Sequence, residues 1–146
     1  MNKDLILKRF EKNLNNYDIN AKIQKIMAKK LIKLIPNKKP NSVLEIGCGT
    51  GFLTKLAVEN ISFQKYTAID IVENCQAYIS KISDKISFIG CDVEDFLQKN
   101  HDKFDLIISN ATLQWVDDFE KGFARLQKAN GEWAKIDKTG KLIKLQ

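Results

Sequence analysis

Three glycines at alternate positions, Gly47, Gly49 and Gly51, follow a short apolar run that starts at Val43. Because glycine has no Cβ and tolerates positive φ, such a loop lets the backbone approach a ligand closely. The stretch 52–60 behind the loop has a helical pattern, and helix N-termini favour anionic groups. The segment therefore predicts a site for a nucleotide-type cofactor. A dinucleotide loop is disfavoured, because its G-x-G-x-x-G spacing would require a third glycine where the chain has Phe52.

Polar residues also end the later apolar runs of the chain. Asp70 follows such a run about 20 positions after Gly47, where a carboxylate can accept hydrogen bonds from both ribose hydroxyls. Asp92 follows the run 86–90, and Asn110 follows the run 104–109. We expect these residues, with the neighbours Ile71 and Val93, to meet at one edge of a parallel sheet.

These motifs, in this order, resemble those of the class I S-adenosylmethionine-dependent methyltransferases, in which an acidic residue such as Glu45 lies just ahead of the glycines. The resemblance covers about residues 5–130 and implies S-adenosylmethionine as the cofactor. It implies that Asp92 accepts a hydrogen bond from the adenine amino group. It also implies that the strand ending at Asn110 lies next to the reactive methyl group.

The N-terminal segment narrows the resemblance. Together with the sequence Leu-Gln-Trp at 113–115, it is similar to the malonyl-acyl-carrier-protein O-methyltransferases of biotin synthesis and to relatives that methylate trans-aconitate; the residues that carry this are Phe10, Asn13, Tyr17, Asp18, Ala21, Gln24, Met27, Ala28 and Leu31. In that family the N-terminal helices cover the cofactor, so Tyr17, Gln24, Gln114 and Trp115 are the expected lid or substrate residues. For Tyr17, and more strongly for Met27 and Leu31, packing of an apolar helix face is the alternative.

The implied substrate is a carboxylate, such as the free carboxylate of malonyl-acyl-carrier protein or of another small acid. A carboxylate is already ionised at neutral pH, since its pKa is near 4, so we expect no catalytic acid or base and no metal. The cysteines Cys48, Cys75 and Cys91 form no C-x-x-C pair and are expected to be reduced thiols.

Each polar site residue also has a structural alternative. Asp70 can cap a helix that starts at Ile71, and Asp92 can cap a turn at Glu94. Glu45 can orient the glycine loop through backbone N–H groups, and Asn110 can be a turn residue.

Strand and helix patterns alternate from residue 42 onward. Strands are predicted at 42–46, 65–69, 86–90 and 104–109, and helices from 51 and at 72–82, 94–99 and 118–129. Two further helices precede them, and Pro36 and Pro40 end the second one. This alternation predicts an α/β fold, a Rossmann-like doubly wound parallel sheet with right-handed crossovers.

We expect an N-terminal helical lid at 1–40, a cofactor-binding core at 41–130 and an atypical tail at 131–146. The tail carries lysines at 135, 138, 141 and 144, which do not suit a strand covered on both faces. The sheet is therefore expected to be incomplete at its C-terminal side, as in a truncated chain. An inactive remnant that only binds the cofactor, with the far edge of the fourth strand uncovered, is an alternative to an active enzyme.

Lysine and arginine outnumber aspartate and glutamate by 24 to 18, which gives a net charge of +6. This excess could attract an acidic carrier protein, or it could reflect a lysine-rich composition without function. There is no block of like charges typical of nucleic-acid binding and no apolar run long enough to span a bilayer. We expect a cytoplasmic, monomeric protein with no nucleic-acid or membrane partner.

Overall fold

The computed structural model describes the backbone of residues 3–13, 22–35, 38–110, 127–136 and 142–145. Within these ranges the strands form one sheet of six, in the order β3-β2-β1-β4-β5-β6. The strand bounds are β1 Ser42–Ile46, β2 Lys65–Asp70, β3 Ile86–Gly90, β4 Phe104–Asn110, β5 Gln127–Ile136 and β6 Leu142–Leu145. Strands β1 to β5 run parallel to their neighbours, and β6 pairs antiparallel with β5.

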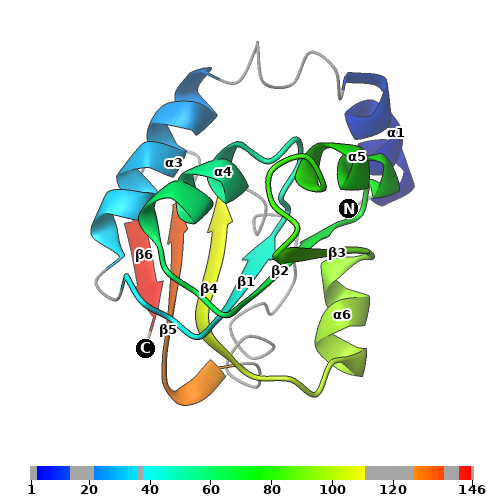
Figure 1. The fold of residues 1–146 in the computed structure, drawn as a ribbon. Coiled ribbons are helices and arrows are strands. Elements are labelled where there is room, and N and C mark those ends of the chain that lie inside the picture. Colours follow the sequence, from blue (N-terminus) through cyan, green and yellow to red (C-terminus); the bar gives the residue numbers. More distant parts are fainter. Residues whose placement is uncertain (1–2, 14–21, 36–37, 111–126, 137–141, 146) are drawn as a thin grey trace.

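The helices of the described ranges surround this sheet (Figure 1). Their bounds are α1 Lys3–Asn13, α3 Lys22–Leu34, α4 Phe52–Asn60, the 3-10 helix η2 Glu73–Cys75, α5 Gln76–Ile79 and α6 Val93–Lys99. The predicted helix 72–82 is thus shorter and begins with a 3-10 turn. The other elements predicted between residues 42 and 110 agree with the structure to within about one residue.

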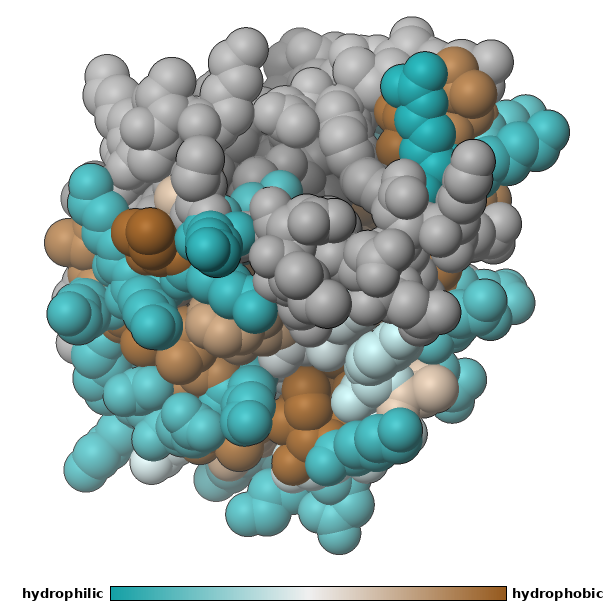
Figure 2. Space-filling view, turned by 90° about the horizontal axis from the view of Figure 1, so that it is seen from above, coloured by the Kyte–Doolittle hydropathy of each residue, from teal (hydrophilic) through white to brown (hydrophobic). Residues whose placement is uncertain are grey.

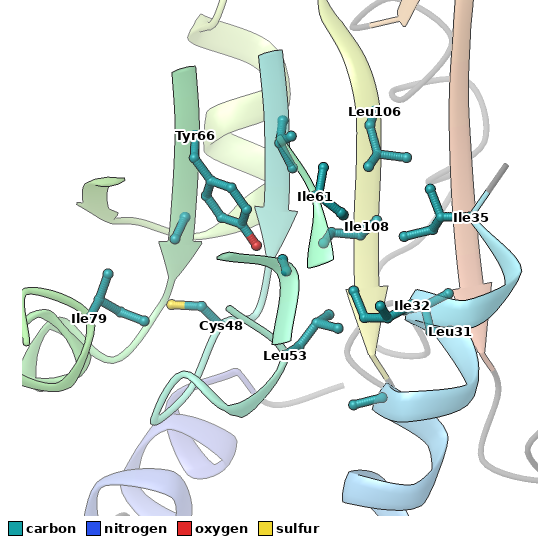
Figure 3. Close-up of a cluster of buried hydrophobic side chains, with 14 of the residues drawn as sticks. Leu31, Ile32, Ile35, Cys48, Leu53, Ile61, Tyr66, Ile79, Leu106 and Ile108 are labelled. Carbon is teal, nitrogen blue, oxygen red and sulfur yellow. The ribbon is translucent and has the colours of Figure 1, made fainter. Parts of the chain in front are cut away.

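Side-chain alternation along β1 divides the core into two layers. Val43 packs with the buried residues of α3, α4 and α5, whereas Leu44 and Ile46 pack with Phe96 and Leu97 of α6 on the opposite face of the sheet. Figure 3 shows the larger cluster, to which α3 contributes Leu31 and Ile32; Ile35, directly after this helix, also belongs to it. Helix α3 is therefore an integral part of the core, and packing is confirmed as a role for Met27 and Leu31, whose exposed fractions are 5% and 0%.

The strand order reverses direction at β1. The chain proceeds from β1 outward to β2 and β3, then returns to place β4 on the other side of β1. This is the topological switch point of a doubly wound sheet, where ligands bind beyond the carboxyl ends of the strands. The predicted Rossmann-like fold is confirmed, and it brings the ends of β1, β2 and β4 together.

The expectation that no strand covers the far edge of β4 is wrong. Residues 127–136 form β5, which pairs parallel with β4, so the far edge of β4 is covered. The predicted helix 118–129 is wrong for 127–129, which belong to β5, and 118–126 lie outside the described residues. The reason is that strand pairing uses backbone N–H and C=O groups, which lysines also possess. A short antiparallel strand, β6, then borders β5.

Seen from above, the described surface mixes hydrophilic side chains with smaller hydrophobic groups (Figure 2). The large hydrophobic side chains exposed there or elsewhere in the described ranges are Leu5, Ile26, Leu34 and Ile89. None of the described helices has both the length and the apolar character required to cross a membrane.

Candidate functional site

The glycine loop leaves β1 in a left-handed backbone conformation. Gly47, Gly49 and Gly51 have φ angles of 73°, 55° and 94°, which residues with a Cβ rarely adopt. The N–H of Gly47 donates to the carbonyl of Ile69 at the end of β2, with an N···O distance of 2.8 Å. Gly51 directly precedes α4 and provides no side-chain cap for it. The loop thus folds back over the end of β2 and delivers the chain to the N-terminus of α4.

Asp70 fastens this loop to the end of β2. Its Oδ2 accepts a hydrogen bond from the N–H of Gly49 at 2.8 Å, and its Oδ1 accepts one from the N–H of Val72 at 2.9 Å. Burial raises the pKa of Asp70, and the backbone N–H groups of Val72, Gly49 and Ile71 oppose this rise. The capping alternative is wrong, because the helical segment begins only at Glu73, with Val72 at its N-cap position.

Glu45 lies beneath the loop and is 1% exposed. Its Oε1 accepts hydrogen bonds from the hydroxyls of Thr54, at 2.6 Å, and Tyr66, at 2.5 Å. The alternative in which Glu45 binds backbone N–H groups is therefore not what the structure shows. Burial raises the pKa of Glu45 to about 7; the two hydroxyls lower it and the charge of Asp70 raises it further.

Asp92 follows β3 and caps α6. Its Oδ1 accepts the N–H of Glu94 at 2.9 Å, so the capping alternative is confirmed. Its Oδ2 accepts a hydrogen bond from Lys3 Nζ of α1 at 2.8 Å, and the same Nζ lies 2.7 Å from Glu94 Oε2. These contacts do not exclude binding of an adenine amino group, because each carboxylate oxygen has two lone pairs.

The end of β4 connects the sheet to α3. Asn110 Nδ2 donates to the backbone carbonyl of Gln24 at 2.9 Å. The buried hydroxyl of Ser109 donates to the carbonyl of Ile46 at 3.0 Å. The hydrogen bond between Asn110 and Gln24 holds the N-terminal part of α3 over the ends of β1 and β4.

A pocket opens between α3, the glycine loop and the ends of these strands. The predicted residues Gln24, Glu45, Gly47, Gly49 and Asn110 line it. Five residues that were not predicted as site residues also line it: Lys25, Cys48, Thr50, Phe52 and Leu53. The Lys25 ammonium lies 5.3 Å from the centre of the Phe52 ring. The Thr50 hydroxyl is buried without a hydrogen-bond partner among the described residues. In the sequence, the only indication that Lys25 belongs to the site is its position directly after Gln24.

The remaining predicted site residues do not line this pocket or lie outside the described residues. Gly51, Asp70 and Asp92 are not among its lining residues. Ile71 packs against the larger core cluster and Val93 against the smaller one. Tyr17, Gln114 and Trp115 lie outside the described residues. In the described part of the chain, no three His, Cys, Asp or Glu side chains are grouped as metal ligands.

Comparison with known proteins identifies the family. The family model described as "Methyltransferase domain" matches residues 19–134. The chain belongs to this methyltransferase family. The match includes the glycine loop, the acidic residues Glu45, Asp70 and Asp92, and most of β5.

Similar curated proteins carry the name malonyl-[acyl-carrier protein] O-methyltransferase. One from Chlorobium luteolum is 37% identical over 135 residues, which is 85% of this chain and 50% of that protein. One from Anoxybacillus flavithermus is 37% identical over 134 residues, which is 90% of this chain and 51% of that protein. The chain thus spans about half the length of these relatives.

Solved structures of methyltransferases share the fold. The N-methyltransferase NodS from Bradyrhizobium japonicum, in complex with S-adenosyl-L-homocysteine, aligns with a TM-score of 0.68 at 19% identity over 88% of this chain and 71% of that one. The DhpI-SAM-HEP complex aligns with a TM-score of 0.73 at 20% identity over 90% of this chain and 63% of that one. At this identity the likeness establishes the class I methyltransferase fold and nothing finer.

Proposed function

We propose that this chain binds S-adenosylmethionine at the carboxyl ends of β1 to β4 and takes part in methyl transfer to a carboxylate. The observation that carries the proposal is the left-handed glycine loop at the switch point, fastened by the Asp70 carboxylate at 2.8 Å. Asp70 and Asp92 offer acceptors for the ribose hydroxyls and the adenine amino group. The pocket at β1 and β4 then binds the amino-acid end of S-adenosylmethionine. There the buried Thr50 hydroxyl, without a partner among the described residues, is available to a ligand.

The pocket's chemistry fits an acceptor that needs no general base. Its described lining includes no histidine, and burial raises the pKa of the Cys48 thiol, so that this thiol stays protonated at neutral pH. The one carboxyl group in this described lining, that of Glu45, is 1% exposed and is held by the hydroxyls of Thr54 and Tyr66. A carboxylate is ionised without assistance. The cofactor supplies an electrophilic methyl group, and the protein's contribution is to align the acceptor oxygen with it and to exclude water.

We propose malonyl-acyl-carrier protein as the acceptor. The names of the similar curated proteins support this choice, and the net charge of +6 would favour docking of an acidic carrier protein. A trans-aconitate-type small acid is the second candidate within the same chemistry. A remnant that binds the cofactor without transferring methyl groups is the third.

Titration calorimetry with S-adenosylhomocysteine tests the cofactor site. We expect saturable binding that Asp70→Ala weakens at least about tenfold, since each hydrogen bond to a charged group contributes about 1.5–3 kcal/mol. Asp84→Ala is the matched control, because Asp84 is exposed and lies before β3, at the opposite end of the sheet. Circular dichroism must show both variants folded. Absence of binding to the folded wild type would refute the proposal.

Transfer of a radiolabelled methyl group then decides the acceptor. Labelling of malonyl-acyl-carrier protein and not of trans-aconitate supports the first candidate, and the reverse result supports the second. Cofactor binding without labelling of either acid supports the remnant.

A further inference from the structure

Glu45 is a buried acid for which methyl transfer itself has no use. It lines the pocket while being only 1% exposed. Both of its hydroxyl partners, Thr54 and Tyr66, donate to the same oxygen, Oε1. Tyr66 is 0% exposed and lies among the apolar side chains of the larger core cluster (Figure 3). The carboxyl group is therefore held rigidly, and neither of these two bonds occupies Oε2.

The groups around Glu45 leave a negative charge there poorly compensated. The phenol of Tyr66, on β2, and the thiol of Cys48, in the glycine loop, both face Glu45. Burial raises the pKa of both groups, so both are neutral. Asp70, at the end of β2, adds a second negative charge nearby. Across the pocket, the ammonium of Lys25 on α3 lies over the Phe52 ring. No ion pair to Glu45 occurs within the described ranges.

The strand order indicates which part of the cofactor reaches this carboxyl group. Glu45 and Asp70 belong to β1 and β2, and Asp92 follows the end of β3; these three strands are consecutive neighbours in the sheet. If adenine and ribose bind at the first two acids, as the proposed function requires, the cationic ammonium and sulfonium groups extend toward Glu45 and the pocket beside it. An acid buried next to a bound cation favours its ionised form.

We propose that Glu45 exchanges a proton for the cationic end of the cofactor: it is largely protonated in the empty pocket at mildly acidic pH and ionised when the cofactor is bound. Only the O–H bond of the carboxyl group breaks, and the proton passes to the solvent. The inference rests on the proposed function and deepens it, because it makes cofactor affinity depend on pH through one residue.

The size of the effect follows from the buried position of the carboxyl group. Its pKa is about 7 in the empty pocket, and an opposite charge at about 4–6 Å lowers a carboxyl pKa by about 1–3 units. For a decrease of about 2 units, binding releases about 0.8 proton at roughly pH 6 and less than about 0.1 at roughly pH 8. The affinity then rises about ninefold between these two pH values.

Calorimetry of S-adenosylmethionine binding at about pH 6, in two buffers of different ionisation enthalpy, measures the released protons directly. We expect about 0.8 proton per site for the wild type, from the shift above, and none for Glu45→Gln, whose amide is the neutral isostere. Methylthioadenosine, which lacks both cationic groups, should release none. Release with S-adenosylhomocysteine assigns the effect to the ammonium, and release with S-adenosylmethionine alone assigns it to the sulfonium.

Tyr66→Phe provides a second test that leaves the pocket lining intact, since Tyr66 is not among the lining residues. Loss of its hydrogen bond removes an interaction that lowers the Glu45 pKa, so proton release should extend to higher pH. In infrared spectra, a carbonyl band of a protonated carboxyl group should disappear from the wild type when S-adenosylmethionine is added.

Two results separate the two proposals. Binding of S-adenosylmethionine with no proton release, or with equal release in Glu45→Gln, overturns this inference and leaves the proposed function standing. Absence of binding to the folded wild type refutes the proposed function and this inference with it.

Discussion

Replacing Gly51 by alanine should destabilise the protein by about 2–3 kcal/mol. The φ of +94° at Gly51 costs a residue with a Cβ about 1–2 kcal/mol. The added Cβ would also lie 2.5 Å from Ile82 Cδ1 and 3.1 Å from Ile79 Cδ1. Ile82 is half-buried and can move the end of its side chain, so we place this contribution near about 1 kcal/mol, the low end for overpacking. Urea unfolding followed by circular dichroism measures the change.

A double-mutant cycle separates the two contributions. Ile82→Ala alone should destabilise the protein by removing apolar contacts, but in its presence Gly51→Ala should cost only the backbone contribution of about 1–2 kcal/mol. Gly51→Ala with wild-type stability would show that the loop is not left-handed at this residue. An unchanged cost of Gly51→Ala beside Ile82→Ala would show that the predicted contact with Ile82 is absent.

Three further predictions concern charges and thiols. The pKa of Glu45 is raised from 4.5 to about 7, so its contribution to stability is greatest below about pH 4.5 and falls by about 3 kcal/mol as the pH rises through 7. In urea unfolding, the stability of Glu45→Gln relative to wild type should therefore increase over this range. A constant difference between the two proteins would contradict the raised pKa. Lys3→Met should lower the free energy of unfolding by less than about 1 kcal/mol, because the ion pairs of Lys3 with Asp92 and Glu94 are partly exposed. This loss should disappear near about 1 M salt, and a loss that does not depend on salt would indicate packing of the side chain instead. Iodoacetamide at about pH 8 should modify Cys91 before Cys48. Cys91 is half-buried and burial raises its pKa to about 11, whereas Cys48 is buried and burial raises its pKa further. Mass spectrometry of peptides reveals the order, and faster labelling of Cys48 would contradict the prediction.

The central strands and their functional ends were predictable because the relevant signals are local. Each of β1 to β4 is a short, largely apolar run that ends in, or is followed within two residues by, a glycine loop, an acidic residue or an amide. Parallel strands of a doubly wound sheet end at one edge, so the placement of Asp70 and Asn110 near the loop followed from the pattern. Local capping was predictable in the same way, as the contact between Asp92 and Glu94 shows.

The partners of Glu45 could not be predicted, because they depend on tertiary packing. Thr54 reaches Glu45 only because α4 packs on the sheet. Tyr66 reaches it because β1 pairs with β2 in a register that places Glu45 opposite Ala68. Tyr66 is then the diagonal neighbour on the same face, within reach of a long side chain. Neither relation has a signature in the sequence near Glu45.

Strand β5 was missed for a different reason. The prediction counted lysines as evidence against a strand, whereas pairing with β4 requires only an extended backbone in the right position. The register between the two strands is irregular, since it shifts between Phe104 and Leu106 of β4. Such irregularity leaves no regular period in the sequence by which the strand could be detected.

The three strand-end acids differ in burial in a way that follows their place in the sheet. Asp92, which follows β3, keeps 21% of its side chain exposed, Asp70 on β2 is partly buried, and Glu45 on β1 is 1% exposed. Electrostatic interactions strengthen as water is excluded, so a charge on Glu45 interacts more strongly with a bound ion than a charge on Asp92 does. An adenine amino group needs only an exposed acceptor, whereas a positive charge gains most from a carboxylate in a dry site. If the cofactor binds as we propose, the increase in burial from Asp92 to Glu45 favours one direction of binding, with the neutral base near Asp92 and the cationic end near Glu45.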